Sequence, residues 1–214
     1  SRRLLGSKDG EYYEVRLSSS KDWVLMDHRI AGKCVVPGTA WLDVACQLGN
    51  IYYSWPQVTL QDVSFLSPCV IEEGESRDVQ VYVSETATSE LSFTVYSRSG
   101  SGIWIEHASG KISRCSSDSE VPAAAVGLKR PGGSRKQTAP ASVTHGAFTF
   151  GPHWDNTGAR WQKDGYYISE IFQPADFLSE LGQFILHPAL MDSACNVFSQ
   201  DFGESTFLPL HFER

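Results

Sequence analysis

Apolar and polar residues alternate over much of the first half of the chain, which is typical of strands with one buried face. The alternation begins at residues 12–17 and returns in later runs that are rich in β-branched and aromatic residues. These runs read QVTLQDVSFLSPCVI, RDVQVYVSETA, LSFTVYSRS and GIWIEHASGKI. Because turn-forming Gly, Ser or Glu residues bound each run, the pattern predicts an antiparallel meander.

One segment between the first strand and the meander has helical instead of alternating spacing. Its apolar positions are Trp41, Leu42, Ala45 and Leu48. Thr39 lies near the start of the segment and Gly49 follows directly after it, and both residue types are common at helix boundaries. We therefore expect a short buried helix that ends before Gly49.

The composition changes at residues 115–144, where Ser, Pro, Gly and Ala dominate and the charges are mixed. A segment of this composition cannot bury a core, so it predicts a linker. The chain is therefore expected to consist of an N-terminal subdomain at residues 1–114, this linker, and a C-terminal subdomain at residues 145–214.

The second half begins to repeat the order of elements of the first. Two short strands are expected on either side of a Lys163-Asp164-Gly165 turn, and a helix is expected at about residues 189–199. The tail STFLPLHFER begins another strand and then stops. We therefore expect the C-terminal subdomain to be incomplete at its C-terminus.

Composition and charge narrow the class of protein. The chain is 41% apolar and 20% charged, as in ordinary soluble domains. It lacks both a run of roughly eighteen apolar residues for a membrane span and the apolar core of a signal peptide, so we expect a cytoplasmic protein without a membrane partner. A formal net charge of -7 argues against nucleic acid. Five cysteines without a CxxC pair indicate neither disulfides nor zinc.

The run HRIAGKCVVPG contains the first group of candidate site residues. It begins with the imidazole of His28, and Gly32 lets the backbone bend close to a ligand. Pro37 fixes the approach to the helix, and the free N–H groups after Gly38 can hold a developing negative oxygen. A single histidine at a strand end is more often a core residue, but this spacing of glycine and proline favours a site.

The run HPALMDSACN places Asp192 and Asn196 four residues apart, on one face of a predicted helix. A carboxyl among apolar neighbours is costly unless it has partners, and burial raises its pKa so that it can stay protonated. The pair can equally be a hydrogen bond on a helix surface, and its apolar neighbours give Asp192 more weight than Asn196.

Together, His28 and Asp192 fit one kind of chemistry. A neutral imidazole and a protonated carboxyl on opposite sides of a substrate can remove a proton and a hydroxide from adjacent carbons. Because the two residues lie in different halves of the chain, only the fold can bring them together.

A third motif, FTFGPHWDN, has a Gly-Pro turn between aromatic residues. It suits a loop that lines a slot for a ligand and suits equally a loop that fills the core. The remaining histidines do not indicate a metal site. His107 on a predicted strand is expected to be structural, and His145, His153 and His211 lack metal-ligand spacing.

These motifs resemble the dehydratase domains of modular polyketide synthases and animal fatty acid synthases. HRIAGKCVVPG is similar to their HxxxGxxxxP signature, HPALMDSACN to their HPAxxDxxxQ/H helix and FGPHW to their YGPxF loop. EHASGKI and FLPLHFER resemble two of their strands. The resemblance implies an α+β double hot-dog, in which each of two antiparallel sheets wraps round a central helix. His28 and Asp192 would then meet across a tunnel for the acyl chain.

The resemblance also implies a lyase that acts on a β-hydroxyacyl thioester on acyl carrier protein. His28 would take the α-proton, the helix start near Gly38 would polarise the thioester carbonyl, and Asp192 would protonate the departing hydroxyl. The implied substrate-binding residues are Gly32, Pro37, Gly38, Phe150, Gly151, Pro152 and Asn196. No directly bound cofactor is expected, since the phosphopantetheine arm of the carrier protein holds the substrate.

The implied partners are acyl carrier protein, neighbouring polyketide synthase domains and a second copy of the chain. Carrier proteins are usually acidic, and this chain is acidic too. Docking is therefore expected at a local basic cluster. The candidates are Arg29 with Lys33, or Lys129, Arg130, Arg135 and Lys136 in the linker.

Three positions depart from the family pattern and leave alternatives open. Phe150 replaces a tyrosine, Asp155-Asn156 replaces Gln-Gly, and Asn196 replaces a longer Gln or His. One alternative is a related domain that shifts a double bond, closes a ring by oxa-Michael addition or adds a β-branch. Another is a non-catalytic docking or structural module, although retention of His28 and Asp192 argues against it.

Overall fold

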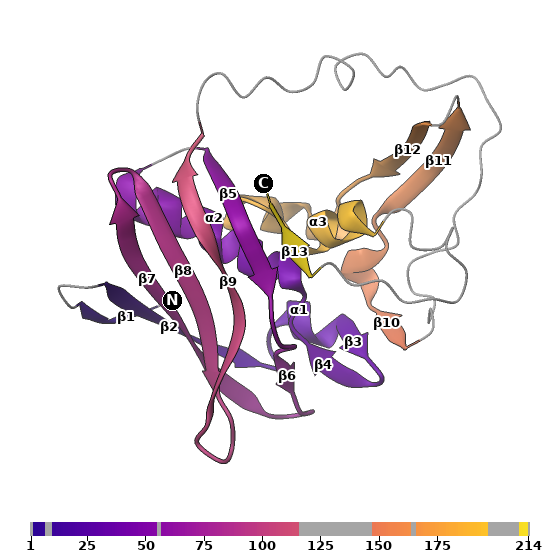
Figure 1. The fold of residues 1–214 in the computed structure, drawn as a ribbon. Coiled ribbons are helices and arrows are strands. Elements are labelled where there is room, and N and C mark those ends of the chain that lie inside the picture. The colour runs from indigo at the N-terminus through magenta and orange to yellow at the C-terminus, as the bar shows by residue number, and fades with distance from the viewer. Residues whose placement is uncertain are drawn as a thin grey trace.

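The computed structural model describes residues 2–6, 10–54, 57–115, 147–163, 166–196 and 210–213 (Figure 1). Within these ranges, no helix is both long and apolar enough to cross a membrane. The predicted linker from residue 116 onward, His145, and the predicted helical residues 197–199 lie outside the described residues.

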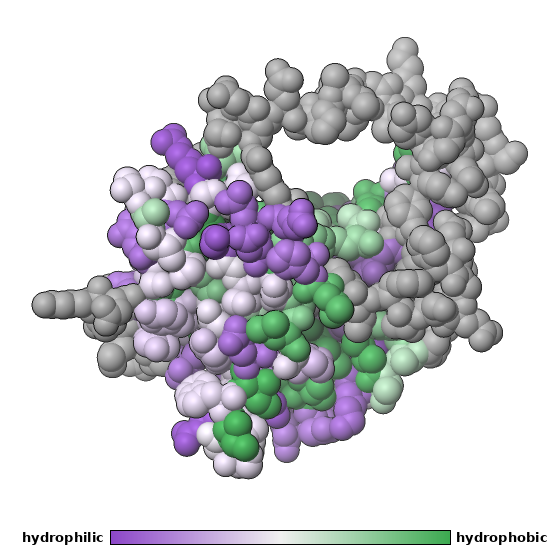
Figure 2. Space-filling view, viewed as in Figure 1, coloured by the Kyte–Doolittle hydropathy of each residue, from purple (hydrophilic) through white to green (hydrophobic). Residues whose placement is uncertain are grey.

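A seven-stranded antiparallel sheet contains strands from all four runs of the predicted meander, but the prediction of a simple meander is wrong for the first run, whose strand pairs with that of the fourth run and not with that of the second. Its order is β1 (Arg2–Gly6), β2 (Glu11–Ser18), β7 (Ser76–Ala87), β8 (Glu90–Arg98), β9 (Trp104–Arg114), β5 (Val58–Phe65) and β13 (His211–Phe212). Buried and less buried positions alternate along β8, as the sequence pattern predicts. The outer face of β7 and β8 carries polar and weakly hydrophilic side chains (Figure 2). The inner face is therefore the one that forms the core.

Helix α2 (Gly38–Tyr53) packs against the inner face of this sheet. All four apolar residues that predicted the helix are buried, and Ala45 is fully buried. The expectation that the helix ends before Gly49 is wrong, because the helix continues to Tyr53 and ends at Ser54 in a left-handed conformation. Gly49 is buried inside the helix. Packing against the sheet outweighs the cost of about 1 kcal/mol for glycine in a helix interior.

A smaller sheet with the order β10-β3-β4-β6 joins the two halves of the chain. It consists of β10 (Phe148–Phe150), β3 (His28–Ile30), β4 (Lys33–Val35) and β6 (Val70–Ile71), and α1 (Trp23–Met26) precedes β3. Strand β10 comes from the predicted C-terminal subdomain and pairs with β3 in the register Phe150↔His28. Similarly, β13 pairs with β5. The two halves thus share these two sheets, and the division into subdomains stays a prediction.

The second half also contains the predicted hairpin and helix. The hairpin is formed by β11 (Thr157–Lys163) and β12 (Tyr166–Ile171), and the helix is α3 (Pro188–Cys195). Two 3-10 segments, η1 (Pro152–Trp154) and η2 (Ala175–Gln183), accompany them. Helices α2 and α3 are in contact, since Thr39 Oγ1 donates a 3.0 Å hydrogen bond to the carbonyl oxygen of Pro188. The fold therefore places the start of α2 beside the start of α3.

Candidate active site

His28 is the first residue of β3 and is 5% exposed, and a backbone carbonyl contacts one nitrogen of its ring. Its Nδ1 lies 2.7 Å from the carbonyl oxygen of Val35. Because a carbonyl only accepts hydrogen bonds, Nδ1 carries the proton and the lone pair is on Nε2. Burial lowers the pKa of His28, and the opposing effects of Asp192 and the Val35 carbonyl are smaller. His28 is therefore suited to act as a neutral base through Nε2.

Asp192 lies in the middle of α3, where it is 9% exposed. The indole N–H of Trp154 donates a 2.8 Å hydrogen bond to Oδ2, and the amide of Asn196 donates a 3.2 Å hydrogen bond to Oδ1. Burial raises the pKa of Asp192, and the smaller opposing effects come from His28 and the Trp154 hydrogen bond. The direction of this pKa shift and its main cause, burial, are those that the sequence predicts.

Trp154 contacts both candidate groups. In addition to its hydrogen bond to Asp192, its ring centroid lies 5.3 Å from that of His28. The structure therefore brings the two halves of the predicted pair to one buried indole. Sequence analysis missed Trp154, although a signal was present: a buried indole N–H needs an acceptor.

The loop from Phe150 to Pro152 begins beside His28. The Phe150 ring is 5.6 Å from the His28 ring and stacks on Trp154 at 5.8 Å. The backbone N–H of Gly151 donates a 2.8 Å hydrogen bond to the carbonyl of Asp27, and a Cβ at Gly151 would clash with the Asp27 carboxyl. Pro152 begins η1. These contacts explain why residue 150 is aromatic and residue 151 is glycine. Contact of Phe150, Gly151 and Pro152 with substrate stays a prediction.

The glycines and the proline of the first motif have conformational roles in this structure. Gly32 has a φ of 78° in the turn between β3 and β4, which favours glycine. Pro37 is the N-cap of α2, and a Cβ at Gly38 would lie 3.0 Å from the Phe65 ring. Pro37 has no side-chain hydrogen bond to the first turn of α2. Contact of these residues with substrate stays a prediction. Because the helix start has no side-chain cap, its backbone N–H groups can donate hydrogen bonds to an oxygen.

Two other sequence inferences have structural counterparts. His107 is 1% exposed, lies 3.0 Å from the Ser67 carbonyl through Nδ1 and lies 2.7 Å from Ser97 Oγ through Nε2. These contacts satisfy both ring nitrogens inside the core, as expected for a structural histidine.

Asn156, one of the departures from the family pattern, is fully buried, and its amide donates to the carbonyl of Ala189 at 3.0 Å. It therefore ties the loop to α3.

The expected docking pair Arg29 and Lys33 is charge-compensated. Arg29 forms a 2.6 Å ion pair with Glu73, and Lys33 forms a 2.9 Å ion pair with Glu72. These four charges cancel, which weakens the case for this cluster as an attractive surface for an acidic partner. The alternative cluster in the linker lies outside the described residues.

Two family models match the chain, one in each half. Residues 2–98 match a family model described as the polyketide synthase dehydratase domain. Residues 118–214 match one described as the polyketide synthase dehydratase N-terminal domain. Together the two matches cover most of the chain.

Curated relatives that match the chain are polyketide synthases and similar enzymes. The chain is 28% identical over 199 residues to mycoketide-CoA synthase of Mycobacterium tuberculosis (strain ATCC 25618 / H37Rv). It is 27% identical over 212 residues to polyketide synthase GfsA of Streptomyces halstedii. The alignments cover 89% and 94% of this chain but only 5% and 3% of the length of these relatives.

Solved structures with a similar fold are dehydratase domains. The dehydratase domain from the CurF module of curacin polyketide synthase has a TM-score of 0.78 at 23% identity, and the match covers 98% of this chain and 79% of that one. A bifunctional dehydratase-cyclase domain in ambruticin biosynthesis has a TM-score of 0.77 at 24% identity, with 98% and 77% coverage. At these identities the likeness shows the fold alone. The predicted α+β double hot-dog is confirmed.

Proposed function

The chain belongs to the polyketide synthase dehydratase family, and on that premise we propose that it removes water from a β-hydroxyacyl thioester to give an α,β-unsaturated acyl chain. One observation carries the proposal. A buried imidazole with a lowered pKa and a buried carboxyl with a raised pKa contact the same residue, Trp154. Dehydration needs a neutral base and a protonated acid at one substrate, and burial favours both of these forms.

The proposed reaction uses His28 as the base and Asp192 as the acid. Nε2 of His28 takes the α-proton, and the electron pair of the C–H bond forms the carbon–carbon double bond. The β C–O bond breaks as Asp192 protonates the hydroxyl, which leaves as water. This leaves an imidazolium and a carboxylate, and transfer of the proton from His28 to Asp192 restores the starting pair.

The start of α2 is proposed to hold the thioester carbonyl. Removal of an α-proton places negative charge on that oxygen, and a helix N-terminus stabilises such charge through its free N–H groups. Pro37 cannot cap these groups, because its side chain has no oxygen. The uncapped first turn of this 16-residue helix supports the assignment.

The substrate is proposed to arrive on the phosphopantetheine arm of acyl carrier protein. The matched relatives include polyketide synthases, and the chain corresponds to a small part of each of them. We therefore propose acyl carrier protein and neighbouring synthase domains as partners. Mass spectrometry of a carrier-bound β-hydroxyacyl chain tests the function, and the expected result is the loss of one water molecule. An unchanged mass with every β-hydroxyacyl chain would contradict it.

Phe150 and Asn196 favour a second candidate function, which is double-bond migration, ring closure or β-branching on an unsaturated acyl chain. Phe150 forms an apolar wall beside His28, at the position where the family has a tyrosine hydroxyl. Asn196 reaches Asp192 Oδ1 at 3.2 Å with a shorter side chain than the family's Gln. A site changed at these two positions suits a substrate without a β-hydroxyl group.

Restoring both side chains distinguishes the two functions. In a Phe150→Tyr, Asn196→Gln double variant, we expect water loss to rise about tenfold, which corresponds to about 1.4 kcal/mol of transition-state stabilisation. The added hydroxyl and longer amide would position the leaving hydroxyl and the acid. The second function predicts the opposite: impaired ring closure or branching, with no gain in dehydration. Parallel mass and NMR assays of both reactions decide between them.

Trp154→Phe tests the hydrogen bond to the acid. The Trp154 indole N–H lowers the pKa of Asp192, so its loss should raise that pKa further. Because the acid must be protonated, the alkaline limb of the pH–rate profile should move to higher pH, and kcat should fall by up to about tenfold as positioning weakens. Trp104→Phe, at a half-exposed indole, is the control. Movement of the alkaline limb to lower pH would refute this role of Trp154.

A further inference from the structure

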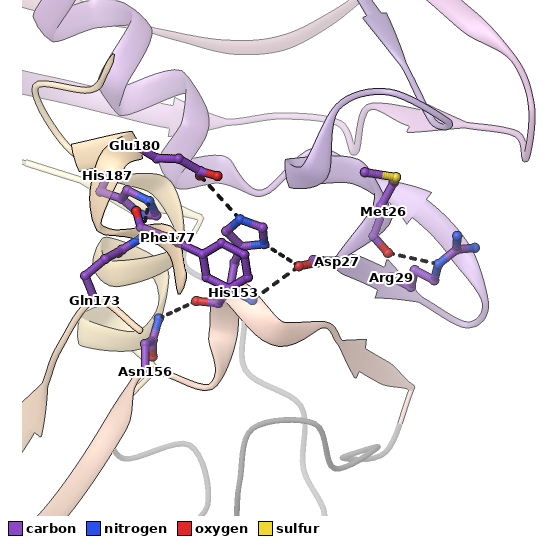
Figure 3. Close-up of polar contacts among 9 residues, drawn as sticks. All are labelled: Met26, Asp27, Arg29, His153, Asn156, Gln173, Phe177, Glu180 and His187. Carbon is purple, nitrogen blue, oxygen red and sulfur yellow. Dashed lines mark hydrogen bonds and ion pairs between the residues drawn. The ribbon is translucent and has the colours of Figure 1, made fainter. Parts of the chain in front are cut away.

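Asp27, the residue before His28, contacts His153 in the loop that carries Trp154 (Figure 3). Its carbonyl oxygen accepts the 2.8 Å hydrogen bond from the Gly151 N–H. Its Oδ2 accepts from the backbone N–H of His153 at 3.2 Å and from Nδ1 of the His153 ring at 2.5 Å. One residue therefore fixes the loop at three points directly beside the proposed base.

The His153 ring is clamped on its faces and on its edge. It stacks between Trp23, at a centroid distance of 4.0 Å, and Phe177, at 3.7 Å. Nε2, the nitrogen that does not contact Asp27, lies 3.3 Å from the Glu180 carboxylate. The side chain is 7% exposed. Two stacked aromatic rings and the hydrogen bond between Nδ1 and Asp27 therefore define the orientation of this buried ring.

The same loop reaches the proposed acid. Trp154 follows His153, and its backbone N–H closes the Gly151 turn at 3.0 Å while its indole donates to Asp192. The carbonyl of His153 accepts from the Asn156 amide at 3.2 Å, and the same amide donates to α3 at Ala189. A continuous series of contacts thus runs from the residue before the base, through His153, to the helix that carries the acid.

We propose that His153 is a positioning residue that sets the placement of Trp154 and Asp192 relative to His28. The inference rests on the proposed function, because it assigns His153 to the dehydration carried out by that pair. His153 is linked to the reacting groups through Asp27, Trp154 and Asn156. Within the described residues, its own hydrogen bonds, ion pairs and ring contacts reach neither reacting group. The contact that matters is the one between Nδ1 and Asp27, because it is the side-chain link to the strand that carries the base.

Three substitutions separate this contact from the rest of the environment of His153. His153→Asn places an amide nitrogen where Nδ1 lies and can still donate to Asp27. His153→Gln places its amide near the position of Nε2, so it reaches toward Glu180 instead. His153→Phe preserves the stacking on Trp23 and Phe177 and removes both polar contacts. His211→Phe on the exposed strand β13 is the matched control.

Two readouts are needed, of which one is independent of turnover. The first is the division of the effect between kcat and KM with carrier-bound β-hydroxyacyl substrate. The second is the NMR resonance of the Trp154 indole proton, assigned by its loss in Trp154→Phe, which reports the hydrogen bond to Asp192. Thermal unfolding of each variant shows that it is folded.

We expect His153→Phe and His153→Gln to lower kcat about tenfold with KM unchanged and to move the Trp154 indole proton upfield. His153→Asn should keep kcat and the chemical shift of the Trp154 indole proton close to those of the parent. Equal losses in the Asn and Gln variants, or parent values in the Gln variant, would overturn the proposal, and this comparison remains available if the Phe variant does not fold. If the parent releases no water, the proposed function fails and the indole resonance alone decides whether His153 positions Trp154.

Discussion

Asp192→Asn is expected to lower the rate of water loss by at least about a hundredfold while the protein remains folded. Asparagine has nearly the same shape and can still accept the Trp154 hydrogen bond, but it has no proton to give to the departing hydroxyl. General acid catalysis typically contributes about 10² to 10⁴ in rate. The measurement is single-turnover water loss from a carrier-bound β-hydroxyacyl chain.

Asp78→Asn is the matched control, because Asp78 is an exposed carboxylate paired with Arg16 on the sheet surface. It should leave the rate unchanged. The pH–rate profile of the parent adds a second check. The rate should rise as His28 loses its proton, at a pH below the ordinary histidine range because burial lowers its pKa. It should fall as Asp192 ionises, at a pH above the ordinary aspartate range because burial raises its pKa. Full activity in Asp192→Asn would remove Asp192 as the acid.

Asp43→Ala should destabilise the contact between the two halves by about 2–4 kcal/mol and reduce activity as a consequence. Asp43 is a buried residue of α2, and its Oδ1 accepts hydrogen bonds from the backbone N–H groups of Ile185 and Leu186, each 2.8 Å long. Gln47 donates to Oδ2 at 2.5 Å. Alanine would leave these donors unpaired, at a cost of about 1–3 kcal/mol for each buried group. Denaturant unfolding measures the loss.

The activity loss is expected because residues 185–186 lead directly into α3, which carries Asp192. Asp43→Asn is the control: it retains an acceptor for both backbone N–H groups, and Gln47 can rotate its amide to accept from the new side chain. The Asn variant should therefore lose less than half as much stability as the Ala variant. Equal losses would show that the charge of Asp43, and not its acceptor role, stabilises the contact.

Local sequence patterns were sufficient to predict most of the elements. Strands β5 and β7–β9, helix α2 and the β11–β12 hairpin were each predicted from periodicity and turn residues, because a strand with one buried face must alternate and a half-buried helix must repeat near 3.6. The end of α2 could not be predicted in this way. Gly49 is a local signal for termination, but the helix continues because its buried face packs against the sheet.

The sequence by itself also indicated His28 and Asp192 as candidates, His28 from the spacing of glycine and proline after it and Asp192 from its apolar neighbours. Only the tertiary structure placed Trp154 between them and brought Asp27 against His153. The Trp154–His28 and His153–Asp27 contacts join residues 126 positions apart, and the Trp154–Asp192 contact joins residues 38 apart. No local periodicity records which distant donor a buried acceptor will find. The chemistry of each group could thus be predicted from its neighbours along the chain, whereas the positioning of the site depends on hydrogen bonds that form only when the two halves pack together.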